Sequence, residues 1–372
     1  MNRTDAVVKR AKELGMPAVA MTDHGNLYGA IEFYQACKKA GVKAILGCEI
    51  YLAPNGMEEK KEIPGRKRAT HMTLLARTIE GWNNLSKLVS LGHLEGLYHG
   101  KPRVDRKALR KFSEGVICLT GCISGPVNEW ILAGDEEKAR DTLAELVDIY
   151  GKEYTFVEVH NHGLEIQSRV TPHLLKLAKE FDLKVVAAND VHFLDKSDHE
   201  AHDVMICIGT GRLMIDENRM RYSPEVYFKT AEEMRELFAD IPGACDVTLE
   251  IAEMCDVTLK LDPTSSEKYP QFGTPDGSPR DEYFRRVCFE GLEKRYGKER
   301  AKEEELIKRL DYEIETINHL GFASYFLITA DFINWGKDHG IPVGPGRGSA
   351  AGSLVAYTMG FTDICPMRFG LL

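Results

Sequence analysis

The segment Gly344–Ser353, with the sequence GPGRGSAAGS, combines residue types that suit phosphate binding. Glycines let a backbone approach a ligand closely, and Arg347 adds a planar, permanently charged guanidinium that matches phosphate oxygens. Ser349 and the small residues after it are typical of the first turn of a helix, whose N–H groups attract anions. The segment fits neither the P-loop nor the GxGxxG dinucleotide fingerprint. It predicts a phosphate cradle; a tight turn that leads into a buried helix is the alternative.

A second group of candidate side chains recurs at the ends of predicted strands in the first 200 residues. Aspartate, glutamate and histidine together favour a hard or borderline divalent ion such as zinc or manganese. Taken singly, each residue has a structural explanation as a surface histidine, a turn or a small buried cysteine. Their joint recurrence predicts a metal or phosphate site. The residues are Asp23 and His24 after the first strand, Glu49 late in the second, Cys122 after the fourth, His160 and His162 closing the fifth, and Asp190 and His192 after the sixth.

The elements that must position these residues alternate between strand and helix, which predicts an α/β fold with a parallel sheet or barrel. In such barrels the carboxyl ends of the strands form the active face. The strands are short apolar runs, as in strands covered on both faces, at Ala18–Thr22, Ala44–Leu52, His71–Ala76, Gly115–Thr120, Tyr154–His160 and Val185–Ala188. The helices have apolar residues at helical spacing, at Val7–Leu14, Gly29–Lys39, Trp82–Leu91, Glu136–Tyr150 and Glu165–Phe181.

After Leu261 the composition changes. Asp262–Pro279 is rich in proline, glycine and serine and predicts a linker. Helical sequence is expected over Asp281–His319, and a strand over Ile341–Val343, just before the cradle. Five aromatic residues between them predict core packing, with stacking on nucleic-acid bases as the alternative; they are Phe322, Tyr325, Phe326, Phe332 and Trp335.

Length and composition bound the remaining possibilities. The 372 residues suggest two or three domains. The formal net charge of −9 does not favour a free-standing nucleic-acid binder, although local patches and metal ions can offset it. Nine cysteines without regular spacing suit a reducing cytosol. No apolar run approaches the roughly 20 residues that a membrane span needs, so we expect a cytoplasmic protein without membrane partners.

Several blocks of the chain, in this order, resemble the alpha subunit of bacterial DNA polymerase III, the C-family of replicative polymerases. The resemblance covers nearly the whole chain and implies a PHP (polymerase and histidinol phosphatase) domain over residues 1–262. This would be a distorted (β/α)7-like barrel lacking its first strand. Residues 263–372 would be an incomplete, α+β part of the polymerase palm. The blocks are MPAVAMTDHGNLYGAIEFYQACKKAG, ILGCEIYLAP, HMTLLA, LTGCISG, AANDVHF, GFASYFLI and GPGRGSAAGSLVAY.

The resemblance also implies site residues. Arg347, Gly348 and Ser349 match the palm loop that meets the triphosphate of the incoming nucleotide. The matching metal ligands of the PHP site are His24, Glu49, His71, Cys122, Asp190 and His192. His71 comes from the resemblance alone, because it begins its strand. The family's His-x-His pair and first-strand aspartate have no counterpart before Val7, so we expect a truncated chain with an incomplete zinc or manganese site.

In the family the aspartates that hold the two catalytic Mg²⁺ ions lie beyond the position of Leu372. We therefore expect no catalytic residue for polymerisation and no polymerase activity in this chain alone. The implied parent is a DNA-directed DNA polymerase, a nucleotidyltransferase of DNA replication. Its PHP domain would be a metal-dependent 3′–5′ exonuclease. The alternatives are a stand-alone phosphoesterase of the histidinol phosphatase type and a non-catalytic scaffold. Implied partners are primer-template DNA, deoxynucleoside triphosphates, the sliding clamp and other holoenzyme subunits.

Overall fold

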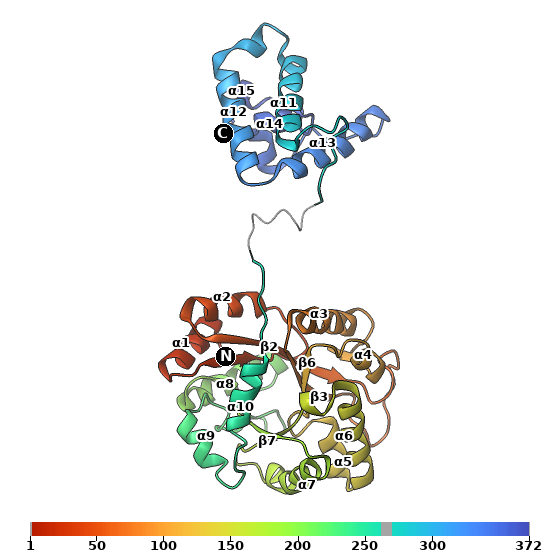
Figure 1. Cartoon of the computed structure of the whole chain (residues 1–372), viewed down its shortest axis with the longest axis vertical. Helices are drawn as coiled ribbons and strands as arrows, with labels where there is room; N and C mark the ends of the chain where they lie inside the picture. Colours follow the sequence, from red (N-terminus) through yellow and green to blue (C-terminus); the bar gives the residue numbers. More distant parts are fainter. Residues whose placement is uncertain (1, 262–269, 372) are drawn as a thin grey trace. The chain divides into compact units, whose positions relative to one another are not determined.

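The computed structural model describes residues 2–261 and 270–371, which fall into two compact units (Figure 1). The first unit is Met1–Leu259 and the second is Lys260–Leu372. Residues 262–269 of the predicted linker lie outside the described residues, and residues 270–279 contain neither helix nor strand.

The first unit is built on an eight-stranded mixed sheet in the order β4-β5-β2-β3-β6-β7-β8, with β1 also paired to β2. The predicted α/β class is confirmed, and so are all six predicted strands. The structure adds two short strands, β4 and β5. The strands are β1 (Ala18–Met21), β2 (Lys43–Leu52), β3 (Thr70–Ala76), β4 (Leu97–Tyr98), β5 (Lys101–Val104), β6 (Val116–Leu119), β7 (Thr155–His160) and β8 (Val185–Ala188).

Strand direction decides which residues meet. The pairs β1–β2, β2–β5, β6–β7 and β7–β8 are parallel, whereas β3 runs antiparallel to both β2 and β6. The start of β3 therefore lies beside the end of β2, and Tyr51 near the end of β2 pairs with His71. A residue that begins β3 thus lies at the same edge as residues that end the other strands.

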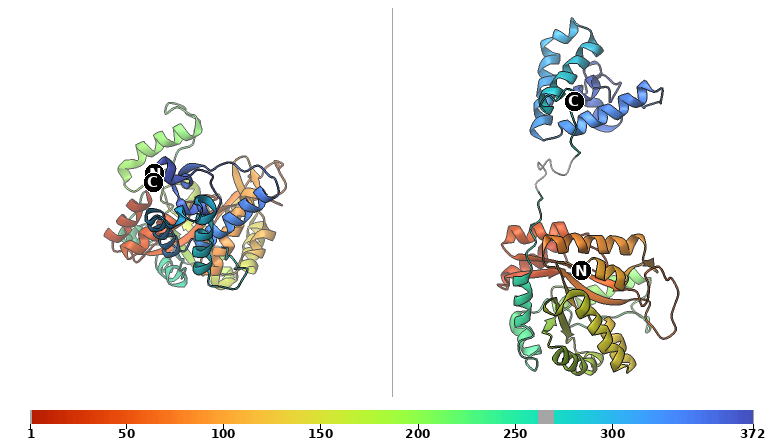
Figure 2. Two further views of the ribbon diagram at one scale, coloured as in Figure 1. Left: turned by 90° about the horizontal axis from the view of Figure 1, so that it is seen from above. Right: turned by 45° about the vertical axis from the view of Figure 1, so that its right-hand side comes forward.

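Helices cover both sides of these strands (Figures 1 and 2). All five helices predicted in this unit are present. They are α1 (Thr4–Glu13), α2 (Ala30–Ala40), α3 (Ile79–Leu94), α4 (Arg106–Lys111), α5 (Pro126–Ala133), α6 (Glu136–Tyr150), α7 (Glu165–Phe181), α8 (His199–Thr210), α9 (Ala231–Leu237) and α10 (Asp246–Met254).

Alternate residues of the strands contribute to two separate apolar cores, because successive side chains of a strand point to opposite faces. One face packs against α3 to α7 in the larger core, which includes Ile50, Leu74 and Val157. The other face forms a smaller core with α10, which we call the inner cluster. It contains Ile45, Leu75, Ile117, Leu119, Phe156 and Val186 from the strands and Val247 and Ile251 from α10.

The described part of the second unit contains helices and irregular segments but no strand. Apolar residues of its first four α-helices, among them Phe284, Leu310, Leu327 and Leu354, form one core. The helices are α11 (Arg280–Tyr296), α12 (Glu304–His319), α13 (Ala323–Asp338), α14 (Leu354–Thr358) and α15 (Pro366–Phe369).

The strand predicted at Ile341–Val343 is wrong. The segment is irregular, and Ile341 is exposed, with its N–H donating to the carbonyl of Gly336 at the end of α13. A strand needs a hydrogen-bonded partner, and residues 270–371 supply none. The α+β character expected for this unit is therefore absent from its described residues.

A close contact fixes α3 against the sheet. The carbonyl of Gly115, just before β6, accepts from the N–H of Arg77, and a Cβ on Gly81 would lie 1.8 Å from that carbonyl oxygen. We predict that Gly81→Ala destabilises the first unit by about 1–3 kcal/mol, as overpacking does, and lowers its thermal midpoint in calorimetry.

Gly209→Ala in α8 is the matched control, because a Cβ there meets no atom within 4 Å. The control should be neutral or stabilising by up to about 1 kcal/mol, since alanine is the better helix former. Equal midpoints for the two variants would contradict the packing argument.

Candidate functional site

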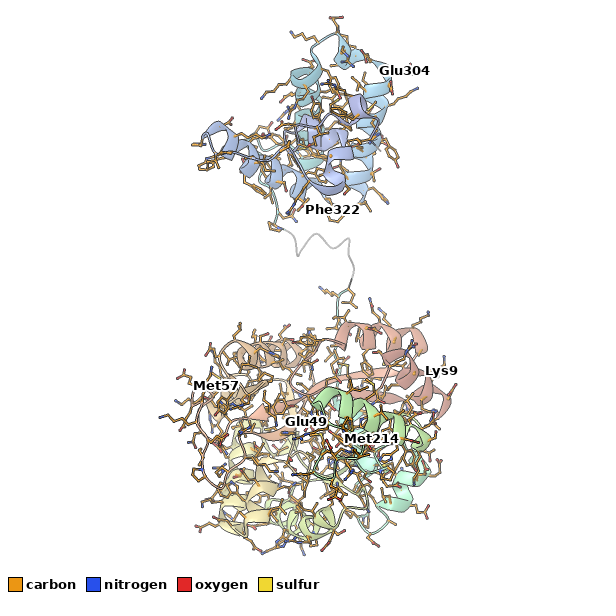
Figure 3. All side chains as sticks on the ribbon, turned by 180° about the vertical axis from the view of Figure 1, so that it is seen from behind. Lys9, Glu49, Met57, Met214, Glu304 and Phe322 are labelled. Atoms are coloured by element: carbon orange, nitrogen blue, oxygen red, sulfur yellow. The ribbon has the colours of Figure 1, made fainter. Side chains whose placement is uncertain are left out.

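Glu49, which is labelled in Figure 3, is the centre of a cluster with His24 and His71. Its carboxylate contacts Nδ1 of His71 at 2.8 Å and Nδ1 of His24 at 3.3 Å. One ligand-type atom from each of the three residues lies within 4.8 Å of the others. The side chain of Glu49 is 12% exposed, whereas that of His24 is 43% exposed. The cluster is therefore buried at Glu49 and open to solvent at His24.

Backbone pairing holds the loop after β1 against the end of β2. The N–H of Glu49 donates to the carbonyl of Asp23, and the N–H of Gly25 donates to the carbonyl of Glu49. His24 and Glu49 form an isolated parallel bridge. Since β1 and β2 run parallel, His24 reaches Glu49 as a continuation of the strand pair. Together with antiparallel β3, which brings His71, this places three predicted ligands at one point.

Asp190 and His192, after β8, lie beside this cluster. Nε2 of His192 is 3.2 Å from Oδ1 of Asp190, and its ring stacks on that of His24 with centroids 6.1 Å apart. Asp190 has φ of 51°, in the left-handed region, and aspartate tolerates that conformation better than most residues. The turn lets two residues of a short segment both face the cluster.

Cys122 completes the set of six predicted metal ligands. Its Sγ is 4.0 Å from Oε1 of Glu49. Burial and the Glu49 carboxylate raise the pKa of the Cys122 thiol to about 12. The thiol is therefore protonated at neutral pH unless a cation replaces the proton, as a coordinated divalent metal does. The structure brings all six predicted residues to one edge; their coordination of a metal stays a prediction.

Electrostatics at this edge favour the ionised form of the Asp190 carboxylate. Burial alone would raise the pKa of Asp190, but the hydrogen bond and charge of His192, with the charges of His160 and His162, hold it well below its usual range. By contrast, burial raises the pKa of Asp23, and the charge of His24 only partly offsets it. Asp190 thus keeps a negative charge available for a cation.

Two tyrosines and a glutamate near the cluster were not singled out from the sequence. The ring of Tyr51 meets His71 edge-on at 4.8 Å, and that of Tyr222 lies 4.3 Å from His192. Tyr51 lies two residues after Glu49 on the same face of β2, which is a usable signal. Tyr222 comes from an irregular segment and has none. The third residue is Glu158, whose Oε1 contacts Nε2 of His160 at 2.9 Å.

The glycine-rich loop of the second unit exposes its predicted phosphate-binding residues. Arg347, Gly348 and Ser349 are all exposed, and a short 3-10 helix covers Gly348–Gly352. The loop is anchored at Gly346, whose Cα lies so close to Thr362 that a Cβ would be 2.7 Å from its hydroxyl. That hydroxyl donates to the carbonyl of Pro345 at 2.6 Å. The anchor leaves the side chain of Arg347 on the surface.

The N-terminus of the α-helix that follows is already occupied by a carboxylate. Glu313 accepts hydrogen bonds from the N–H groups of Leu354 and Val355 and from the hydroxyl of Ser353, at 2.8–3.0 Å. Arg309 pairs with the same carboxylate at 2.6 Å and donates to the carbonyl of Gly352. The helix that the sequence led us to expect at the cradle thus uses its own anion, and the exposed 3-10 turn is left for a ligand.

The aromatic residues of α13 and its start divide between the core and the surface. Phe326 packs in the core against Phe284 and Phe361. Tyr325, Phe332 and Trp335 are more than half exposed. Core packing therefore explains only part of the aromatic group.

Comparisons with known proteins agree with these two units. Residues 1–162 match the family described as "PHP domain", and residues 282–372 match "Bacterial DNA polymerase III alpha NTPase domain". The chain is similar to DNA polymerase III subunit alpha of Treponema pallidum, with 39% identity over 98% of this chain and 31% of the relative. It is 42% identical to that of Caulobacter vibrioides, over 100% of this chain and 32% of the relative.

The chain spans about a third of the length of these curated relatives. Among solved structures it is similar to a putative metal-dependent phosphoesterase from Bifidobacterium adolescentis, with a TM-score of 0.32 and 14% identity over 64% of this chain and 91% of that one. At that level the similarity supports no inference about function. No helix in the described residues is long and apolar enough to cross a bilayer.

Replacing Glu313 tests whether its carboxylate stabilises the start of the helix after the loop. Glu313→Gln should destabilise the second unit by about 1–3 kcal/mol, because charge-assisted bonds to Arg309 and to two backbone N–H groups are lost. Calorimetry would show a lower thermal midpoint. Glu304→Gln is the matched control, since it also lies on α12 and pairs with a basic residue four positions on, but is exposed. The control should shift stability by less than about 0.5 kcal/mol; an equal loss in both variants would contradict the capping role.

Proposed function

Because this chain carries a PHP domain and is related along its length to the DNA polymerase III alpha subunits, we propose that it forms part of a bacterial replicative DNA polymerase. The whole enzyme would add deoxynucleotides to a primer 3′ end as a template directs. We assign residues 1–262 to the PHP domain and 263–372 to the first part of the palm. The observation that carries the proposal is one chain holding both a cluster of metal-binding side chains and an exposed glycine-rich loop with an arginine.

In polymerisation the primer 3′ oxygen attacks the α-phosphorus of the nucleotide and pyrophosphate leaves. Mg²⁺ ions supply charge stabilisation for such transfers. In this chain Arg347 would bind the triphosphate with its guanidinium, and the backbone N–H groups of Gly348 and Ser349 would donate to phosphate oxygens. The anchoring of Gly346 against Thr362 supports this role, because it fixes the loop while leaving those groups exposed.

The donor set at the sheet edge fits a borderline divalent cation such as Zn²⁺ or Mn²⁺. Imidazole nitrogens, carboxylate oxygens and one thiol are present, and the Cys122 thiol needs a cation to ionise. The ligands would be His24, Glu49, His71, Cys122, Asp190 and His192. A bound ion would polarise a phosphodiester for hydrolysis.

We propose that this edge hydrolyses the last phosphodiester of a DNA 3′ end, as a 3′–5′ exonuclease. The exposed side chain of His24 supports access of a phosphate to the cluster. Primer-template DNA and deoxynucleoside triphosphates are the proposed ligands. The sliding clamp and other holoenzyme subunits are the proposed partners of the whole polymerase, in the cytoplasm.

Replacing Asp190 tests the metal site. Asp190→Asn should lower the affinity of the chain for Zn²⁺ and Mn²⁺ at least tenfold, because it removes a negative ligand, and isothermal titration with elemental analysis would measure this. Asp182→Asn is the matched control, since Asp182 has the same φ of 51° but pairs with Lys152 on the surface. Unchanged metal affinity in Asp190→Asn would overturn the assignment of Asp190, and no metal binding by the wild-type chain would overturn the site.

Replacing Arg347 tests the loop. Arg347→Ala should weaken binding of a deoxynucleoside triphosphate to this chain several-fold, and Arg347→Lys should restore it only in part, because an ammonium cannot form the two-pronged contact of a guanidinium. Chemical-shift titration of the Gly348 and Ser349 amides would measure both. Arg3→Ala is the control, because Arg3 is also an exposed arginine but lies in the first unit, and it should leave the titration unchanged. Amides that do not respond to nucleotide would exclude this loop as the phosphate site.

A further inference from the structure

Glu158 and His160 form a buried pair on β7 that the proposed ligand set does not use. Their relative exposures are 5% and 8%, and Nε2 of His160 is 2.9 Å from Oε1 of Glu158. The other oxygen of Glu158 accepts from the N–H of Gly121 at 3.0 Å, and its backbone N–H donates to the hydroxyl of Thr120. The carboxylate is thus fixed to the end of β6, directly before Cys122.

The hydrogen bond decides which ring nitrogen of His160 has a lone pair. An ionised carboxylate only accepts, so Nε2 carries the proton and Nδ1 of the neutral ring does not. Nδ1 is buried and has no hydrogen-bond partner among the described residues. A buried polar atom without a partner costs about 1–3 kcal/mol. A ligand bound to Nδ1 of His160 would remove this cost.

The register of the sheet directs His160 toward the metal cluster. His160 lies on the same face of β7 as Phe156, a member of the inner cluster, because the two residues are four positions apart and side chains of a strand alternate between faces. It pairs with Ala188 on β8, two residues before Asp190. Its ring therefore lies between the strand that leads to Cys122 and the strand that leads to Asp190. Consistent with this, burial alone would lower the pKa of His160, but the hydrogen bond and charge of Glu158, with the charges of Asp190 and Glu49, raise it.

We propose that Nδ1 of His160 is a further ligand of the metal bound at this edge, and that Glu158 is the carboxylate that orients it. Metal-bound histidines commonly donate their other N–H to a carboxylate, which fixes the tautomer and strengthens the ligand. The Glu158–His160 pair has this arrangement. The inference rests on the metal site proposed above and adds a ligand and its supporting residue to it.

His162 shows what a structural histidine looks like at the same strand end. Its Nε2 contacts the carbonyl of Asn189 at 2.8 Å, and its Nδ1 contacts the amide of Gln167 at 3.0 Å. Both ring nitrogens have protein partners, so His162 has none to offer a metal. It is therefore the matched control for His160.

Glutamine substitutions separate the two roles, because the glutamine amide can replace Nε2 of histidine but not Nδ1. The wild-type 372-residue chain, His160→Gln and His162→Gln would each be titrated with Co²⁺, followed by visible absorption, and with Zn²⁺ by calorimetry. We expect His160→Gln to lose at least tenfold in affinity and to change the Co²⁺ spectrum. We expect His162→Gln to stay within about twofold of wild type.

A second measurement needs no variant to fold. In the wild-type chain labelled with ¹⁵N-histidine, Nδ1 of His160 should resonate as an unprotonated nitrogen and shift when Zn²⁺ is added. An Nδ1 signal that is unmoved at saturating Zn²⁺, or equal affinities for wild type and His160→Gln, would overturn the role of His160 while leaving the metal site. Absence of metal binding by the wild-type chain would overturn both.

Discussion

The pairing of β2 with three other strands is the constraint on which the first unit depends. This ten-residue strand pairs with β1, β3 and β5, so the loop after β1 and the start of β3 both meet its end. Glu49 stands at that end, and its carboxylate contacts His24 from the loop after β1 and His71 from β3. Pairing along β2 therefore brings His24 and His71, which lie 25 and 22 positions from Glu49 in the chain, to 3.3 Å and 2.8 Å from its carboxylate. Side-chain alternation then places apolar residues of the same face below the cluster, in contact with α10.

Three carboxylates pair with four histidines at this edge: Glu49 with His24 and His71, Asp190 with His192, and Glu158 with His160. Carboxylates in partly buried positions repel one another, and each pair offsets part of that cost. The carboxylates differ in how accessible they are to a cation. Glu49 and Asp190 have histidines as their partners at the open edge. Glu158 is held by Gly121 and His160 and is more deeply buried, so it can act only through His160.

Local sequence patterns predicted much of this arrangement. Apolar runs identified six strands, and the polar residues that end them identified most of the cluster. Direction along the sheet is a long-range property, so the role of His71 could not follow from its place at the start of β3. The short strands β4 and β5, with residues such as Lys101 and Arg103, lack an apolar run. The strand expected at Ile341–Val343 shows the reverse error, because an apolar run does not supply a partner.

The same distinction applies to the second unit. A serine and small residues before an apolar run predict a helix start at Ser349, whereas a 3-10 turn lies there and the α-helix begins at Leu354. Glu313, 40 residues before Ser353, decides what binds at that start. Its negative charge and that of an incoming phosphate would repel each other, and its oxygens already accept the N–H groups of Leu354 and Val355. A phosphate would therefore gain most from groups upstream of the α-helix. Those are the Arg347 guanidinium and the amides of the 3-10 turn, which the anchoring of Gly346 keeps at the surface.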